Sequence, residues 1–135
     1  MELNKILKYS VINNLKYILM TVNEVYNYLG GKIYDAIPSE IEEWDKAKMY
    51  AKRLEGYFSA NAKIYINENE LELEYFEARW EMATYVHKLH AITTEGGHNR
   101  WNKLEFTLFP DGKFDLQFIW DQEWQDEVDG YNKNV

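Results

Sequence analysis

The amino-acid sequence predicts an α+β fold, in which a single antiparallel β-sheet packs against helices. Apolar residues recur at spacings of three and four over residues 3–37 and again over 80–90, as on the buried face of a helix. They alternate with polar residues over 46–75 and 104–120, as in half-buried strands. We therefore expect two hairpins plus an extra strand, in helix–ββ(β)–helix–ββ order, with an added N-terminal helix.

The length of 135 residues and the 46% hydrophobic content fit one soluble domain over residues 1–135. Cysteine is absent, which excludes disulfide scaffolds, zinc–cysteine sites and cysteine nucleophiles and fits a cytoplasmic protein. The longest apolar run is four residues, whereas a membrane-spanning helix needs about 20. We expect no membrane association and no secretory signal.

The first helical pattern divides in two. Residues 1–19 are expected to form an amphipathic helix that extends the domain, and Thr21 to Glu24 reads as a capping box that begins a second helix. Pro38 should end that helix, and one further helical turn is expected after it. The apolar positions of both helices are Leu3, Leu7, Val11, Leu15, Ile18, Val22, Val25, Leu29, Ile33 and Ile37.

Period-two alternation predicts three successive strands after the second helix. The first begins at Lys46, the second follows a turn at Glu55-Gly56, and the third follows a turn at Asn67 to Asn69. The expected inward positions are Ala47, Met49, Ala51, Ala60, Ala62, Ile64, Ile66, Leu71, Leu73 and Tyr75.

A third helical pattern and a second hairpin complete the domain. Trp80, Ala83, Val86 (or His87) and Leu89-His90 share one expected helix face, and residues 94–99 form a loop. Pro110-Asp111-Gly112 then predicts a tight turn, because proline presets one backbone angle and glycine accepts a positive φ. The expected inward positions of its two strands are Leu104, Phe106, Leu108, Phe114, Leu116, Phe118 and Trp120.

The net charge of −8 is concentrated in two segments. Residues 68–81 carry six glutamates against Arg79, and residues 105–129 carry eight acids against Lys113. This distribution argues against a general nucleic-acid binder, since neutralising phosphates requires clustered lysine and arginine. It suits either plain solubility or an electropositive partner.

No motif for catalysis or cofactor binding is present. The serines lack a nucleophile elbow, and the glycine pairs lack the further residues of phosphate-binding loops. His87, His90 and His98 raise the alternative of a metalloenzyme, but their spacing matches no closed ligand set, so we expect partly buried or surface histidines. We predict no enzyme activity, no cofactor and no metal.

Five tryptophans and eleven tyrosines exceed what a small core easily encloses. Trp124 follows the last strand and lies among acids, so it is expected either to fold back on the core or to anchor a basic partner. The candidate partner-binding residues are Trp120, Asp121, Glu123, Trp124, Asp126 and Glu127.

The C-terminal hairpin resembles the YezG-type antitoxin, or immunity, family. The matching features are Trp101 before the alternating strand, the turn Asp111-Gly112-Lys113-Phe114, and the return strand ending in Trp120-Asp121. Upstream, a helix closing on Ile37-Pro38, a hairpin led by Trp44 and a Glu-rich helix with Trp80 follow the same order. The resemblance covers residues 21–127 and leaves 1–19 outside.

The resemblance implies a small cytoplasmic protein that binds and neutralises a cognate toxin exported against rival bacteria, often a nuclease. A basic nuclease domain would suit the acidic charge of this chain. The alternative is a regulatory or scaffold module that binds some other protein through the same aromatic and acidic residues.

Overall fold

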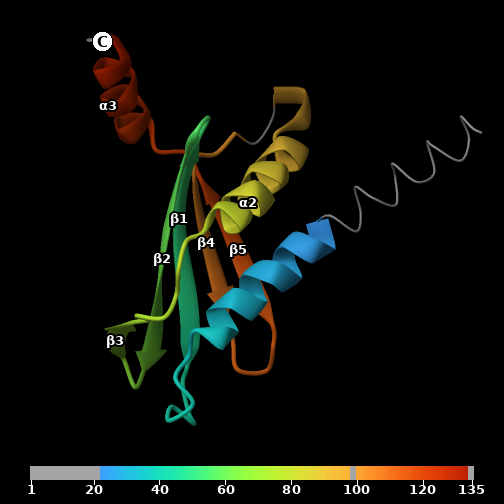
Figure 1. Ribbon diagram of the computed structural model, residues 1–135, viewed down its shortest axis with the longest axis vertical. Coiled ribbons are helices and arrows are strands. Elements are labelled where there is room, and N and C mark those ends of the chain that lie inside the picture. Colours follow the sequence, from blue (N-terminus) through green and yellow to red (C-terminus); the bar gives the residue numbers. More distant parts are fainter. Residues whose placement is uncertain (1–21, 98–99, 134–135) are drawn as a thin grey trace, which may run out of the picture.

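The computed structural model describes residues 22–97 and 100–133 and confirms the α+β fold class (Figure 1). The strands form one antiparallel sheet in the order β3-β2-β1-β4-β5, so β1 lies at its centre. In chain order, a helix over residues 22–35 is followed by β1 (Lys46–Leu54), β2 (Tyr57–Ile66), β3 (Asn69–Glu72), α2 (Trp80–Thr93), a 3-10 turn (Glu95–Gly97), β4 (Lys103–Leu108), β5 (Phe114–Ile119) and α3 (Gln122–Lys133).

The expected hairpin turns place glycine or asparagine at positive φ, and only Glu68 adopts a positive φ that its residue type disfavours. Gly56 joins β1 to β2 with φ +74°, and Gly112 joins β4 to β5 with φ +88°. Between β2 and β3, Asn67 and Glu68 both have positive φ, as a two-residue type I′ connection requires. The turn chemistry therefore sets the register of all three hairpins.

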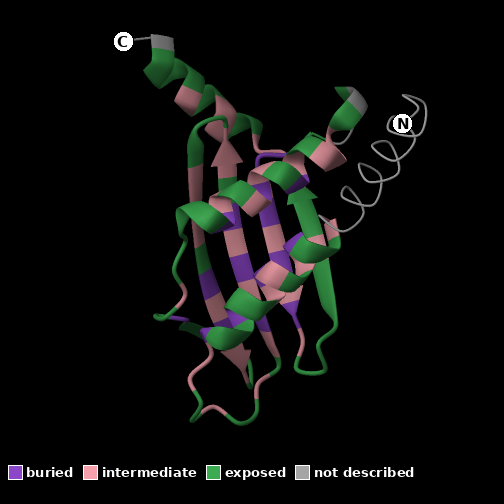
Figure 2. Ribbon diagram, turned by 45° about the vertical axis from the view of Figure 1, so that its right-hand side comes forward, coloured by how far each residue is buried: buried purple, intermediate pink, exposed green. Residues whose placement is uncertain are grey.

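The core lies between one face of the sheet and two helices, the helix over residues 22–35 and α2 (Figures 1 and 2). Alternate residues of β1, β2 and β4 point into this layer and are buried, as their period-two pattern predicts. The largest fully buried side chains are Trp101, Phe106, Leu29, Ile33, Met49, Ile64, Met82, Leu89, Leu104, Val25, Val86 and Asn102.

The helix expected from residue 21 is confirmed over residues 22–35, where Val25, Leu29 and Ile33 are fully buried. The expected helix over 1–19 and the capping role of Thr21 lie outside the described residues. The prediction of a further helical turn after Pro38 is wrong. Residues 38–41 form a β-turn instead, in which Ile41 N donates to Pro38 O at 3.0 Å. Residues 36–45 connect the helix layer to the sheet through turns and irregular backbone.

Five predicted core positions are exposed: Leu71, Tyr75, Trp80, Phe114 and Phe118. Tyr75 lies beyond the end of β3, and Phe114 and Phe118 lie on the edge strand β5. Leu71 is 51% exposed because β3 is a four-residue edge strand, and burial resumes only at Leu73 beyond its end. Trp80 is 82% exposed because it is the first residue of α2, whose buried face consists of Met82, Val86 and Leu89. Of the helices within the described residues, none has the length and apolar character needed to cross a membrane.

Candidate protein-binding surface

The candidate residues of the acidic C-terminal segment lie at the end of the sheet, where β5 leads into α3. α3 projects from this end instead of packing on the helix-covered face (Figure 1). Trp120 and Asp121 form the connection, and Glu123, Trp124, Asp126 and Glu127 belong to α3. The alternating pattern of β5 ends here as predicted, whereas the helix that follows was not predicted from the sequence.

A buried asparagine holds the β5–α3 connection in place. Asn102, which precedes β4, is 0% exposed. Its Nδ2 donates to Asp121 O at 2.9 Å, and its Oδ1 accepts from Asp121 N at 2.8 Å. Its backbone N donates to Ile119 O, and its backbone O accepts from Arg53 N. One side chain thus satisfies both polar backbone groups of Asp121 at the point where the strand becomes a helix.

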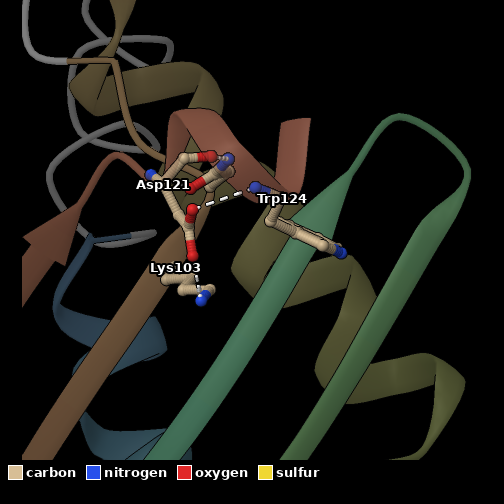
Figure 3. A network of polar contacts seen from close by, with 4 residues as sticks. Lys103, Asp121 and Trp124 are labelled. Atoms are coloured by element: carbon tan, nitrogen blue, oxygen red, sulfur yellow. Dashed lines mark hydrogen bonds and ion pairs between the residues drawn. The ribbon is translucent and has the colours of Figure 1, made fainter. Parts of the chain in front are cut away.

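Asp121 caps the N-terminus of α3 (Figure 3). Its Oδ1 accepts from Trp124 N at 3.0 Å, which satisfies an amide that has no partner within the helix. Its Oδ2 forms an ion pair with Lys103 Nζ from β4. The Lys103 hydrogen bond, followed by the Trp124 amide, lowers the pKa of the Asp121 carboxyl. This residue therefore fixes α3 to the sheet, and its carboxylate is already engaged within the chain.

Replacing the Asp121 cap should loosen α3 without unfolding the sheet. In Asp121→Ala we expect faster amide hydrogen exchange in the first turn of α3, because the Trp124 amide loses its acceptor. Asp121→Asn is the matched control, since asparagine still caps but forms no ion pair. Equal exchange rates in Asp121→Ala and the wild type would contradict the capping role.

The two tryptophans of the segment have different neighbours. The half-buried Trp124 ring lies 5.7 Å from the Tyr57 ring, and the Lys52 ammonium sits 5.6 Å from its centroid. The Trp120 ring lies 4.1 Å from the Arg100 guanidinium and donates from Nε1 to Gln122 at 2.9 Å. Trp124 thus folds back onto the end of the β1–β2 hairpin and keeps part of its ring in solvent.

The remaining surface of α3 is acidic with an apolar stripe. Glu123, Asp126 and Glu127 are all exposed. Val128 and Tyr131 continue the line of Trp124 at helical spacing, and Tyr131 is 80% exposed. Val128 and Tyr131 were not among the predicted partner-binding residues, although their helical spacing from Trp124 is visible in the sequence.

The face of the sheet opposite the helices adds a second feature that sequence reasoning missed. Strand register places lysines from β1, β2 and β4 on this open face. A cavity of about 390 Å³ lies among its side chains. Lys52 and Lys103 line the cavity and also contact Trp124 and Asp121, so the cavity adjoins the base of α3. The five lysines are Lys46, Lys48, Lys52, Lys63 and Lys103.

Acidic and aromatic partners hold these lysines in place. Lys48 Nζ lies 3.5 Å from Glu105, and Lys63 is paired with Glu70 and Glu72. The hydroxyls of Tyr50 and Tyr65 are 2.7 Å apart, and burial together with this hydrogen bond raises the pKa of Tyr50. The open face therefore presents an ordered array of cations, ring faces and hydroxyls beside an acidic helix.

The histidines of α2 lie next to a cation. His87 Nδ1 accepts from Arg53 Nε at 3.1 Å, and the His90 ring packs edge-on against Trp101 at 4.9 Å. Across residues 22–97 and 100–133, no group of three histidine, aspartate or glutamate side chains could hold a metal ion. His98 lies outside the described residues. The geometry of His87 and His90 gives the metalloenzyme alternative no support, since an adjacent guanidinium disfavours a second cation.

Burial should make these histidines a source of pH-dependent stability. Burial, then the Arg53 charge, lowers the pKa of His90 to about 4, and the same two causes lower that of His87. The unfolded chain, with a histidine pKa near ~6.5, then binds more protons between about pH 6.5 and 4. The contribution of the two histidines to the free energy of unfolding is fully present above pH 6.5. It should decrease as the pH falls from 6.5 to 4.

The test compares denaturant unfolding of the wild type and His90→Gln between pH 7 and 4.5. We expect the variant to lose less stability over this range, by on the order of 2 kcal/mol. His98→Gln, at the third histidine of the sequence, is the control for the loss of a histidine. Parallel curves for the wild type and His90→Gln would contradict the assigned burial effect.

The chain was compared with known proteins. Neither models of protein families nor curated protein sequences gave a match.

Proposed function

We propose that this protein is an immunity protein, or antitoxin, that binds and neutralises a cognate bacterial toxin of the nuclease class by protein–protein contact. The observation that carries the proposal is an acidic helix that projects from the sheet while its base is fixed by Asn102, Asp121 and Lys103. A helix held in this way loses little conformational freedom on binding, which favours affinity.

The charges beside the helix support a nuclease as the partner. α3 presents exposed carboxylates, which suit the lysines and arginines that bind phosphates in a nuclease. On the adjoining open face, Lys46 and Lys52 contact aromatic rings, and lysines of this kind suit the carboxylates that hold catalytic metal ions in many nucleases. A surface with both signs side by side complements such a site better than an acidic patch alone.

The aromatic residues supply the apolar part of the proposed interface. Trp124 and Tyr131 lie on one stripe of α3, and tyrosine and tryptophan are enriched among residues that dominate binding energy. The proposed contact surface thus comprises the candidate residues Trp120, Glu123, Trp124, Asp126 and Glu127, joined by Tyr131. Asp121 acts beneath them by positioning α3.

Co-expression tests the proposed function directly. The protein should restore growth to cells that express the toxin encoded beside its own gene, and the two should co-purify. A catalytically inactive toxin should still co-purify, since neutralisation here requires binding and not turnover. Failure of both rescue and co-purification would exclude an immunity role for that pair. Binding to a non-toxic protein through the same surface would favour the regulatory or scaffold alternative.

A further inference from the structure

The two edges of the sheet differ in how they are protected. At one edge, β3 is only four residues long and carries Glu70 and Glu72. The short length and the charges both discourage the addition of another strand. At the other edge, β5 is six residues long and Asp115 is its one charged residue. Within the described part of the chain, only β4 pairs with β5, so its outer edge is open.

The hydrogen-bonding pattern shows which residues of β5 face outward. Phe109 N donates to Lys113 O, which makes residues 109 and 113 a hydrogen-bonded pair of the β4–β5 hairpin. Because such pairs alternate along an antiparallel ladder, residues 115, 117 and 119 bond to β4. The backbone groups of Phe114, Leu116 and Phe118 therefore point away from the sheet.

The same three residues carry an exposed apolar stripe. Phe114 is 39% and Phe118 is 38% exposed, and Leu116 is half-buried, whereas the inward residues of β4 are buried (Figure 2). Cavities lie on this side of the edge at both ends of the strand, of about 290 Å³ beside Phe114 and 740 Å³ beside Phe118. Backbone donors, backbone acceptors and apolar side chains thus coincide on one free edge, the combination that strand addition uses.

We propose that β5 pairs antiparallel with β5 of a second copy of this chain, centred on Leu116, to give a two-fold symmetric dimer with a continuous ten-stranded sheet. In this register Phe114 faces Phe118 of the second copy, and Leu116 faces its own equivalent. Asp115 faces Gln117, so no like charges oppose each other. A register centred on Asp115 would place two carboxylates face to face, which is unfavourable.

The charge of the two chains opposes their association, and the antiparallel arrangement keeps this repulsion small. Each chain carries a net charge of −8, and α3 directly follows β5. Antiparallel pairing sends the two α3 helices to opposite ends of the dimer, where their carboxylates are far apart. Both proposed partner-binding surfaces would remain accessible. The dimer does not depend on the proposed function, and either can fail alone.

Sedimentation velocity over a concentration series tests the dimer. We expect a reversible monomer–dimer equilibrium, because a single strand pair makes a small interface. Higher salt should strengthen the dimer by screening the repulsion between two acidic chains. Leu116→Lys and Leu116→Glu should each be monomeric, since like charges meet at the two-fold axis, and a mixture of the two should form the heterodimer. A wild type that is monomeric throughout, or a Leu116→Lys variant that remains dimeric, would overturn the proposal.

Cross-linking provides a measurement that does not require a charged substitution to be tolerated. The chain has no cysteine, so Leu116→Cys introduces a single thiol. Opposed residues of a hydrogen-bonded antiparallel pair have Cα atoms about 5.5 Å apart, within the range of a disulfide. Leu116→Cys should form a dimer on oxidation, and Leu71→Cys, at the opposite edge of the sheet, is the matched control. Equal cross-linking of both variants would contradict pairing through β5. The proposal would also be overturned if β5 paired with a strand of another protein or with residues 1–21 instead of with a second β5.

Discussion

Asn102→Ala is expected to lower the free energy of unfolding by about 1–3 kcal/mol, because Asp121 N loses its acceptor and Asp121 O keeps only the hydrogen bond from Gln125 N. The side chain is fully buried, so water cannot easily replace it. We expect the loss to appear in two ways: a lower denaturant midpoint for the whole domain, and faster amide exchange throughout α3.

Asn61→Ala is the matched control for Asn102→Ala. Asn61 is an exposed asparagine of β2 on the open face, and its loss should change stability by less than about 0.5 kcal/mol. Asn102→Asp separates shape from hydrogen bonding, because it keeps the acceptor for Asp121 N but loses the donor to Asp121 O. If Asn102→Ala unfolded at the same denaturant concentration as the wild type, contacts other than those of Asn102 would hold the connection between β5 and α3.

Reversing the exposed charges of α3 should slow association with a basic partner by about 10–100-fold at low salt. The variant is Glu123→Lys, Asp126→Lys and Glu127→Lys combined, since all three side chains are exposed. Asp121 is left intact because its replacement would disturb the helix cap. Stopped-flow or biosensor measurements against the toxin should show the difference shrinking as the salt concentration rises, since salt screens exposed charges.

A control with the same change in net charge isolates the role of α3. Glu40→Lys, Glu42→Lys and Glu43→Lys together reverse three other exposed acids, in the loop between the helix over residues 22–35 and β1. If overall charge alone steers the partner, both triple variants should slow association equally, and α3 would not be the contact surface. If the α3 variant alone is slow, the acidic helix is the site of approach.

The alternation of apolar residues in the sequence was sufficient to predict the antiparallel sheet and its hairpins. Period-two patterns such as Leu104, Phe106 and Leu108 identify a half-buried strand on their own, and the turn at Pro110 to Gly112 fixes the hairpin. Prediction failed where burial depends on distant elements. Leu71 fits the pattern but lies on an edge strand, and Trp80 fits a helical spacing but begins its helix.

The candidate surface was predicted less completely than the sheet. The acidic segment around Trp124 could be located because eight acids fall between residues 105 and 129. The helix was missed because few apolar residues mark it, and its N-cap works with Asn102 and Lys103, some 19 residues earlier in the chain. Hydrogen bonds between distant segments leave no periodic signal in a sequence.

The sequence by itself determined the fold class, the order of strands along the chain and the concentration of negative charge, because each depends on composition or local periodicity. Only the tertiary structure decided that Asp121 is a cap, that Trp124 packs on Tyr57 and Lys52, and that five lysines share the open face beside an acidic helix. These features arise where strands far apart in the chain become neighbours, and strand order is set by the packing of the whole sheet.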